Sequence, residues 1–260
     1  SVLTGANLAN RELLYLGVSG DGDSASIGLG QFAHAMRRGV RMAYIVENNG
    51  VYGLTKGQFS ATADQGSKSK KGVVNSDSPV DLVAMALQLG ATYVARGFSG
   101  DKAQLVPLIK GAISHGGAAF IDVISPCVAF NNHAGSTRSY DHVRAHNEAV
   151  NRIDFIDLAP EIHADPSPGD VLELPQPEGG FMRLRKLHAD YDPTDRRGAM
   201  NHLATLQAEG EIPTGLLYVD PQAGDLHAAL NTVPKALNRL NEAELCPGEA
   251  ALAKINASLR

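Results

Sequence analysis

Short apolar runs alternate with helix-like stretches along the first half of the chain. The apolar runs over 13–19 and 42–46 are typical of buried strands, and residues 26–37 between them have helical spacing without proline. This order predicts a βαβ unit, whose right-handed crossover places both strand ends at the same edge of a parallel sheet. Ligands of open α/β sheets bind in the crevice at that edge.

The alternation continues downstream and predicts a helix from 79 to 90, a strand over 93–96, a helix over 101–114 and a strand over 118–124. Strands that alternate with helices in this way indicate a parallel sheet flanked by helices, which is the α/β fold class. His and charged residues recur at helical periods over 138–153, so an exposed helix is expected there. The polar stretch 60–78 predicts a loop, which either becomes ordered over a bound ligand or is a solvated surface loop.

Beyond residue 158 the pattern changes. Prolines and glycines between 160 and 180 are expected to break regular elements. A helix near 197–209, a strand over 215–219 and short helices around Leu237 and Ala250 complete the chain. We therefore expect an α/β domain over 1–158 and a C-terminal arm and extension over 159–260, which wraps the parent domain or a partner.

Composition narrows the function classes. The chain has 260 residues, 43% of them hydrophobic, and a net charge of −5 without a basic tract. This balance argues against nucleic acid and against an anionic membrane surface as partners, and no apolar run approaches the length of a bilayer-spanning helix. Two cysteines cannot form a disulfide framework, which favours the reducing cytoplasm.

Polar residues follow both strands of the βαβ unit. Gly20-Asp21-Gly22-Asp23 ends the first strand, and Asn49 follows the second. Because these strand ends share one edge, Asp21 and Asn49 are expected to meet there as hard oxygen ligands, a donor set that suits Mg²⁺ bridged to a diphosphate. The alternative is that Asp21 only caps the following helix.

Two other ligand motifs fail at this position. An EF-hand loop that started at Asp21 would need Gly and Glu where Ser26 and Phe32 stand. A dinucleotide-binding G-x-G-x-x-G would need a third glycine after Gly28 and Gly30, where Ala33 stands. The motif permits alanine there, and Glu47 could be its acidic residue, so a weak signal for dinucleotide binding is left.

The GDG followed by a downstream Asn resembles the signature of thiamine diphosphate enzymes. The sequence beyond these two motifs resembles the β subunit of 2-oxoacid:ferredoxin oxidoreductases, especially the 2-oxoglutarate type. The matching segments spread over nearly the whole chain: 19–23, 26–28, 52–58 with Ser60, 124–132, 183–187, 190–196, 214–218 and 245–248.

The resemblance implies roles for particular residues. Asp21, Asn49 and the backbone carbonyl of Val51 would hold Mg²⁺. The diphosphate and the rest of the cofactor would contact Gly20, Gly22, Asp23, Leu54 and Thr55. Lys56 would face the reactive ring and pair with a substrate carboxylate, with Gln58 as a second substrate contact; a solvated surface lysine is the alternative for Lys56.

Cys127 follows Pro126 at a predicted strand end and resembles the fourth ligand of a [4Fe–4S] cluster. By chemistry alone the alternative is a small buried hydrophobe, which an isolated cysteine most often is. The family's other cluster cysteines lie ahead of the segment that begins here with residues 1–10, so we expect the chain to lack that N-terminal segment. Cys246 is expected to be structural, and His142 and His146 to lie on a solvated helix face rather than to bind zinc.

The implied activity is coenzyme A-dependent, reversible oxidative decarboxylation of 2-oxoglutarate to succinyl-CoA with ferredoxin as electron acceptor. The implied cofactors are thiamine diphosphate, Mg²⁺ and a [4Fe–4S] cluster. An α subunit would supply the pyrimidine-binding domain, in a dimer of αβ pairs. Pyruvate or broad 2-oxoacid specificity, a non-redox thiamine diphosphate decarboxylase or synthase, and a binding scaffold without turnover stay open as alternatives.

Overall fold

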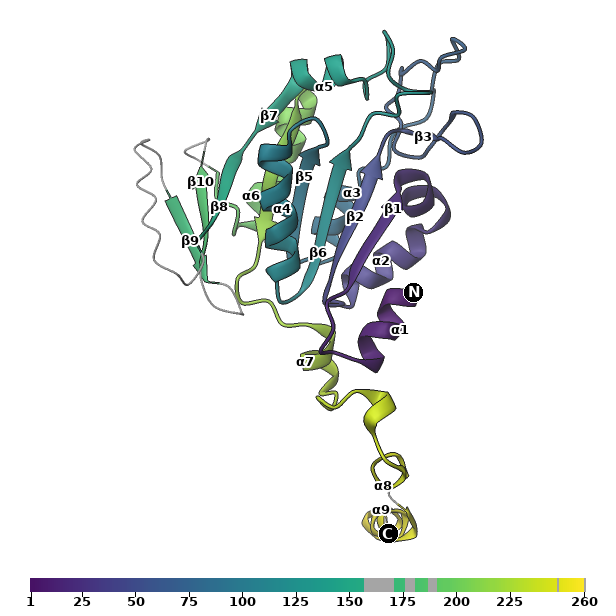
Figure 1. The fold of residues 1–260 in the computed structure, drawn as a ribbon, viewed down its shortest axis with the longest axis vertical. Coiled ribbons are helices and arrows are strands. Elements are labelled where there is room, and N and C mark those ends of the chain that lie inside the picture. Colours follow the sequence, from purple (N-terminus) through teal and green to yellow (C-terminus); the bar gives the residue numbers. More distant parts are fainter. Residues whose placement is uncertain (157–170, 176–180, 187–190, 247, 260) are drawn as a thin grey trace.

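A six-stranded sheet forms the centre of the computed structural model, which describes residues 1–156, 171–175, 181–186, 191–246 and 248–259. The strand order is β1-β2-β6-β5-β11-β7 (Figure 1). The first four strands in this order are mutually parallel, and β11 runs antiparallel to β5. The strands are β1 (Leu16–Gly20), β2 (Met42–Asn48), β5 (Tyr93–Phe98), β6 (Ala118–Ile124), β7 (Asn147–Ala149) and β11 (Ile212–Val219).

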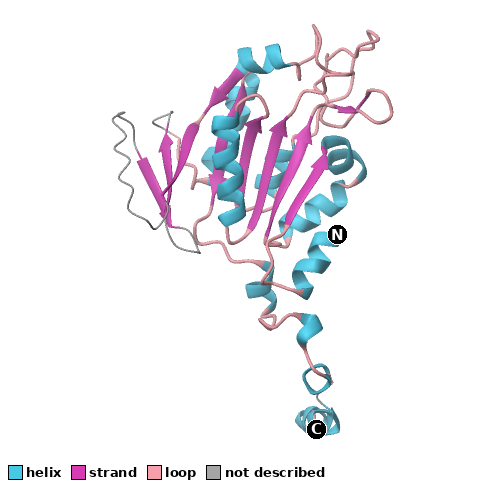
Figure 2. Ribbon diagram, viewed as in Figure 1, coloured by secondary structure: helices cyan, strands magenta, loops and turns pink. Residues whose placement is uncertain are grey.

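Helices pack on both faces of this sheet (Figure 2). One face carries α2 (Leu29–Arg37), α3 (Leu82–Gln88) and α6 (Arg196–Ala208), whose buried side chains share one cluster with β2, β5, β6 and β11. The opposite face carries α4 (Lys102–Ser114), which shares a second cluster with the same four strands. The predicted α/β class with a mostly parallel sheet is therefore confirmed.

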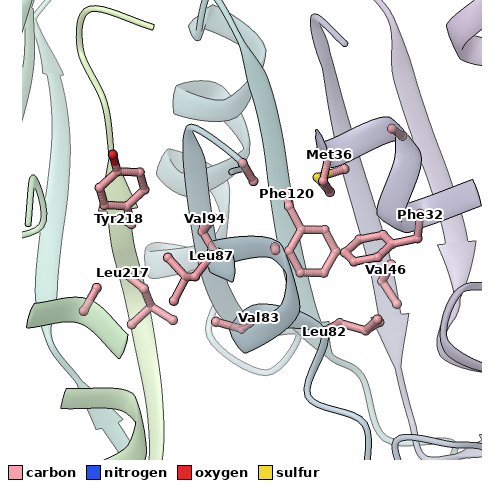
Figure 3. Close-up of a cluster of buried hydrophobic side chains, with 14 of the residues drawn as sticks. Phe32, Met36, Val46, Leu82, Val83, Leu87, Val94, Phe120, Leu217 and Tyr218 are labelled. Atoms are coloured by element: carbon pink, nitrogen blue, oxygen red, sulfur yellow. The ribbon is translucent and has the colours of Figure 1, made fainter. Parts of the chain in front are cut away.

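The central strand β6 shows why both faces are apolar. Phe120 points to the α2 and α3 side, where its ring packs edge-on to Phe32 with ring centroids 5.0 Å apart (Figure 3). Its neighbour Ile121 points to the α4 side. A strand that is covered on both faces reads as a continuous apolar run, which made the prediction for 118–124 reliable.

Side-chain caps set where two helices begin. Asp81 accepts hydrogen bonds from the backbone N–H groups of Val83 and Ala84, and Asp101 accepts one from Gln104. The helices therefore start at Leu82 and Lys102, slightly later than the apolar spacing predicts, because an N-cap residue itself has non-helical backbone angles.

The first strand and helix are shifted from their predicted bounds. The strand expected over 13–19 runs from Leu16 to Gly20, and Leu16 and Val18 are exposed because β1 is the sheet edge. The helix expected over 26–37 is two segments, a π-helix η1 (Gly22–Ile27) followed by α2. The helical turn thus begins directly after Asp21.

The prediction of a single helix over 138–153 is wrong. The structure has α5 (Tyr140–His146), followed by β7 and then β8 (Asn151–Ile156). β7 pairs with β11, and Thr214 Oγ1 donates to Asn147 Oδ1 at 2.6 Å. These pairings lie far apart in sequence, so local periodicity gave no sign of them.

The region predicted as a C-terminal extension contributes to the core. β11 lies in the main sheet, and α6 buries Ala199, Leu203 and Leu206. The boundary predicted at 158 therefore does not mark the end of the α/β unit. The expectation that prolines exclude regular elements is also wrong in part, because β9 (Val171–Pro175) and β10 (Phe181–Lys186) form an antiparallel sheet with β8. The expected breaks over 160–168 lie outside the described residues.

The remaining elements lie at the two ends of the sheet. Helix α1 (Val2–Ala9) precedes β1, and a short hairpin of β3 (Val51–Tyr52) and β4 (Gln58–Phe59) follows β2. The chain after β11 leads away from the sheet, as Figure 1 shows, through α7 (Leu226–Leu230), η2 (Leu237–Arg239), α8 (Glu242–Leu245) and α9 (Gly248–Ser258). In the part of the chain that the structure describes, no helix is both long and apolar enough to cross a membrane.

His115 makes the stability of this fold depend on pH. Burial lowers the pKa of His115 from its ordinary 6.5 to about 4, so the folded state favours the neutral ring, which contacts Thr92 Oγ1 at 2.8 Å. The contribution of the neutral ring to stability is complete above pH 6.5 and is lost as the pH falls toward 4.

We expect the unfolding free energy to fall by about 2 kcal/mol between pH 7 and pH 5, at about 1.4 kcal/mol per pKa unit. Urea denaturation should show a smaller fall for His115→Gln; an equal fall in both proteins would contradict this role.

Candidate functional site

The candidate site lies at the carboxyl edge of the parallel strands. Asp21 directly follows β1, and Asn49 directly follows β2. Every residue of β1 pairs with a residue of β2. Asp21 is 1% exposed. A buried carboxylate is tolerated only when hydrogen bonds or opposite charge compensate it, so its partners define the site.

Asp21 accepts hydrogen bonds from two loops. The backbone N–H of Gly50 donates to Oδ2 at 3.0 Å, and that of Asn49 donates to Oδ1 at 3.4 Å. The hydroxyls of Ser60 and Thr62 also donate to Oδ2. These four donors hold the carboxylate in place and tie the segments 49–50 and 60–62 to the end of β1.

The Asn49 loop is itself fixed by side-chain hydrogen bonds. Asn49 Oδ1 accepts from the backbone N–H of Val51 at 3.0 Å, and the Asn49 carbonyl accepts from Asn131 Nδ2 at 2.7 Å. The three residues predicted as metal ligands, Asp21, Asn49 and Val51, therefore belong to one hydrogen-bonded cluster. Their role as ligands stays a prediction.

A buried network continues from this cluster into the sheet. Thr62 Oγ1 lies 3.0 Å from Asn48 Oδ1, and Asn48 Nδ2 donates to Asp122 Oδ1 at 3.0 Å. Arg96 links Asp122 to Asp81, with N–O distances of 2.8 Å and 2.9 Å. The network therefore joins the site to β6, β5 and the cap of α3.

Charge balance within the network shows in two pKa shifts. Burial alone would lower the pKa of Arg96, but the flanking Asp81 and Asp122 carboxylates outweigh it and raise that pKa above its ordinary range. Burial alone would likewise raise the pKa of Asp81, but the Arg96 guanidinium and the hydrogen bonds from Ala84 N–H and Gln207 together lower that pKa. Beside this network lies a cavity of about 640 Å³, which Asn48, Arg96 and Asp122 help to line.

Four of the residues predicted to contact cofactor or substrate lie on the β3–β4 hairpin: Leu54, Thr55 and Lys56 in its loop and Gln58 at the start of β4. Leu54 is 99% exposed, and Thr55, Lys56 and Gln58 are exposed as well. Thr55 Oγ1 donates to Gln58 Oε1 at 2.6 Å across the loop. Lys56 has a φ of 77°, a left-handed conformation that is uncommon for a residue with a side chain and marks local strain.

Gly20, Gly22 and Asp23 surround the start of the π-helix. Tyr52 donates from its hydroxyl to the Gly22 carbonyl at 3.3 Å, and this contact places the β3 strand over the first helical turn. Asp23 is exposed at that turn. The first N–H groups of a helical segment lack partners within the helix, so this turn presents donors suited to an anion.

Cys127 lies at the same edge, in the turn after β6, and is half-buried. Its carbonyl accepts hydrogen bonds from the backbone N–H groups of Phe130 and Asn131. Cys127 and Cys246 are both free thiols, and Cys246 is exposed. His142 and His146 lie on α5 and stack with ring centroids 4.0 Å apart; both are partly exposed, so the helix face that carries them is only partly solvated.

The donor set at Asp21 fits a hard divalent cation. Among the described residues no three His, Cys, Asp or Glu side chains gather as a metal site, but the expected set needs only one carboxylate, one amide oxygen and one carbonyl. Mg²⁺ usually takes one or two carboxylates and completes its shell with phosphate and water. The buried Asp21 carboxylate, hydrogen-bonded to the backbone N–H of Asn49, supplies the carboxylate of such a set.

Sequence reasoning missed three residues of the site. Ser60 and Thr62 lie in the stretch predicted only as a polar loop, and Asn131 lies in the segment that was noted only for Cys127. Ser60 and Asn131 fall inside segments that carried the family resemblance, which was the one available signal. Their contacts to Asp21 and Asn49 cross long stretches of sequence and were not predictable from spacing.

Comparisons with known proteins agree with this geometry. Residues 1–123 match the family of thiamine pyrophosphate enzymes, C-terminal TPP binding domain. The chain is 47% identical over 131 residues to a 2-oxoacid:ferredoxin oxidoreductase subunit beta of Saccharolobus solfataricus, covering 49% of this chain and 42% of that protein. It is 34% identical over 182 residues to the 2-oxoglutarate synthase subunit KorB of Methanothermobacter thermautotrophicus, covering 68% and 64% respectively.

A solved structure is similar over the whole chain. It is a 2-oxoglutarate:ferredoxin oxidoreductase from Magnetococcus marinus with 2-oxoglutarate, coenzyme A and succinyl-CoA bound, and it matches with a TM-score of 0.68 and 29% identity. The match covers 100% of this chain and 72% of that one.

The fold and the family match together define a thiamine diphosphate-binding α/β domain. Within that class, the chain belongs to the family of 2-oxoacid:ferredoxin oxidoreductase β subunits. It spans less than half the length of several of the curated relatives that it matches.

Replacing Asp21 tests the site directly. Asp21→Asn keeps the size of the side chain but removes the charge that a Mg²⁺ ligand supplies, so we expect Mg²⁺-dependent thiamine diphosphate affinity to fall at least ~100-fold, since a charged ligand is lost from a hard-cation site. Isothermal titration calorimetry of the assembled protein measures this, with Asp141→Asn, at a fully exposed carboxylate outside the Asp21 cluster, as the control. Unchanged affinity in Asp21→Asn would contradict the assignment.

Proposed function

We propose that this chain is part of the β subunit of a 2-oxoglutarate:ferredoxin oxidoreductase. The proposed reaction is the reversible, coenzyme A-dependent oxidative decarboxylation of 2-oxoglutarate to succinyl-CoA, with ferredoxin taking up the electrons. The observation that carries this proposal is the buried Asp21 carboxylate, held beside Asn49 at the carboxyl edge of a sheet whose family binds thiamine pyrophosphate. The solved relative with 2-oxoglutarate and coenzyme A bound supports the choice of substrate.

In this proposal Asp21, Asn49 and the Val51 carbonyl hold Mg²⁺, and Gly20, Gly22, Asp23, Leu54 and Thr55 contact the cofactor. The donors at the start of the π-helix favour its diphosphate. Bound thiamine diphosphate would supply the nucleophilic carbon and the electron sink for decarboxylation. The residues of this chain bind and orient the cofactor and the substrate around it.

Lys56 is the proposed substrate-binding residue, with Gln58 beside it. Its exposed ammonium lies on the loop that follows the Asn49 cluster, and an ammonium there would pair with the second carboxylate of 2-oxoglutarate. Thr55 and Gln58 already share a hydrogen bond across this loop, which limits their orientations. The strained backbone at Lys56 is consistent with a position retained for its side chain.

Cys127 is the proposed cluster ligand of this chain. Its half-buried thiol follows β6, the strand that pairs with β2, and so stands at the same sheet edge as the candidate cofactor residues. A [4Fe–4S] cluster needs Cys thiolates, so the other ligands would come from outside these residues. The alternative is a non-redox thiamine diphosphate decarboxylase or synthase, in which Cys127 is only a packing residue.

A partner subunit is part of the proposal. Large apolar side chains are exposed on three segments that follow strands of the sheet: Ile27 at the end of η1, Leu54 between β3 and β4, and Val128 in the turn after β6. Exposed apolar groups that gather around a site indicate a contact surface. We propose that an α subunit with the pyrimidine-binding domain covers this edge, in a heterotetramer of two αβ pairs, in the cytoplasm.

Substrate preference tests the role of Lys56. Lys56→Gly removes the side chain with its ammonium, and glycine adopts the positive φ of this position without strain, so the change adds no backbone cost. We expect kcat/KM for 2-oxoglutarate to fall about 10- to 100-fold more than kcat/KM for pyruvate, as loss of a charge-assisted hydrogen bond predicts. Steady-state kinetics of the assembled enzyme measures both values.

The neighbouring Thr55→Ser, which keeps its hydroxyl, serves as the matched control in these assays and should leave the ratio unchanged. The isolated chain is expected to give no turnover with either substrate. Equal losses for both oxoacids in Lys56→Gly would rule out the proposed carboxylate contact, and turnover by the chain alone would rule out the need for a partner.

Iron content tests the role of Cys127. In the full-length assembled subunit, Cys127→Ala should remove the electron paramagnetic resonance signal of the reduced cluster and abolish ferredoxin reduction, because one of the thiolate ligands is lost. Cys246→Ser, at the exposed thiol, should leave both intact. A normal signal and full iron content in Cys127→Ala would show that Cys127 is a packing residue and would favour the non-redox alternative.

A further inference from the structure

The turn from Cys127 to Asn131 contacts the loop of candidate cofactor residues at two points. Asn131 Nδ2 donates to the carbonyl of Asn49 at 2.7 Å. Phe130 packs against Gly57, where an added Cβ would lie 3.0 Å from the Cβ of Phe130. One short turn therefore supports the loop at the proposed metal ligand Asn49 and again beside Lys56.

Asn131 is held rigidly in this position. Its side chain is buried, with the whole residue 1% exposed. Its backbone N–H donates to the Cys127 carbonyl at 2.8 Å, and its own carbonyl accepts from Ser136 Oγ at 3.0 Å. Because its backbone is held within the Cys127 turn and its side-chain nitrogen is bonded to the Asn49 carbonyl, Asn131 connects the position of that turn to Asn49.

The contact also constrains the residue after Asn49. Gly50 has a φ of 74°, and a Cβ added there would lie 3.1 Å from Asn131 Nδ2. The same left-handed turn lets the backbone N–H of Gly50 donate to Asp21 Oδ2 at 3.0 Å. The Asn131 amide therefore closes the loop on the side opposite to Asp21.

We propose that Asn131 is a positioning residue, which fixes Asn49 and Val51 for the metal–diphosphate and couples occupancy of that site to the Cys127 thiol through the Cys127–Asn131 turn. This inference rests on the proposed function, because it takes Asn49 and Val51 as metal ligands. Coupling between two sites is reciprocal in binding free energy. Occupancy of the site should thus protect Cys127, and loosening the turn should weaken cofactor binding.

The first experiment measures cofactor affinity in the assembled protein. Asn131→Ala should weaken Mg²⁺-dependent thiamine diphosphate binding about 10-fold by calorimetry, as loss of one buried hydrogen bond to the ligand loop predicts. The matched control is Asn132→Ala, whose exposed side chain accepts only from the Tyr140 backbone N–H on the far side of the turn. Its affinity should stay within about twofold of the wild type, because no loop contact is lost.

The second experiment measures the coupling to Cys127. In protein stripped of iron by a chelator, the rate of alkylation of Cys127 by iodoacetamide is followed from the mass of its peptide. Mg²⁺ with thiamine diphosphate should slow this rate at least about 5-fold in the wild type, the lower end of usual coupling. The protection should disappear in Asn131→Ala and persist in Asn132→Ala.

The outcomes separate the two proposals. If the wild type does not bind the cofactor, the proposed function fails. If the wild type binds it and Asn131→Ala binds equally well, Asn131 is only structural and this inference fails alone, even where thermal denaturation shows a lower stability. Equal alkylation rates with and without cofactor in the wild type overturn the coupling. Should Asn131→Ala not fold, Asn131→Ser, which lacks the amide nitrogen but keeps a polar side chain, carries the same expectations.

Discussion

The buried carboxylate of Asp21 is the interaction on which the rest of the site depends. It stands at the end of β1 and accepts hydrogen bonds from the loop after β2 and from the segment 60–62. An ionised group at this depth is tolerated only while these donors remain in place. The hydrogen bonds to this one carboxylate therefore fix Asn49 and the start of the loop that carries Lys56, even without a bound ligand.

The same constraint extends through the sheet. Thr62 and Asn48 connect Asp21 to the Asp122–Arg96–Asp81 group, and Asp81 caps α3 and accepts from Gln207 of α6 at 2.5 Å. Breaking a buried charge pair on one side is far more costly than never having formed it. The network therefore couples the packing of α3 and α6 to the geometry of the site.

The sheet edge also brings two proposed chemistries within one loop cluster. The metal–diphosphate ligands follow β1 and β2, and the candidate cluster ligand Cys127 follows β6, the strand that pairs directly with β2. Neighbouring parallel strands end at the same edge, which is the general reason that α/β sheets bind ligands there. The Asn131 contact turns this proximity into a defined hydrogen bond between the two segments.

The sequence by itself determined the parts of this protein that depend on local pattern. Apolar runs identified β2, β5 and β6, because strands buried on both faces carry continuous apolar residues, and the Gly20–Asp23 and Asn49 motifs identified the edge at which a site would form. Only the tertiary structure decided the pairing of β7 with β11, the return of the C-terminal half into the main sheet, and the contacts of Ser60, Thr62 and Asn131. These features join residues that lie far apart in the chain, and their stability comes from burial and hydrogen bonds that exist only once the chain has folded, so no local periodicity records them.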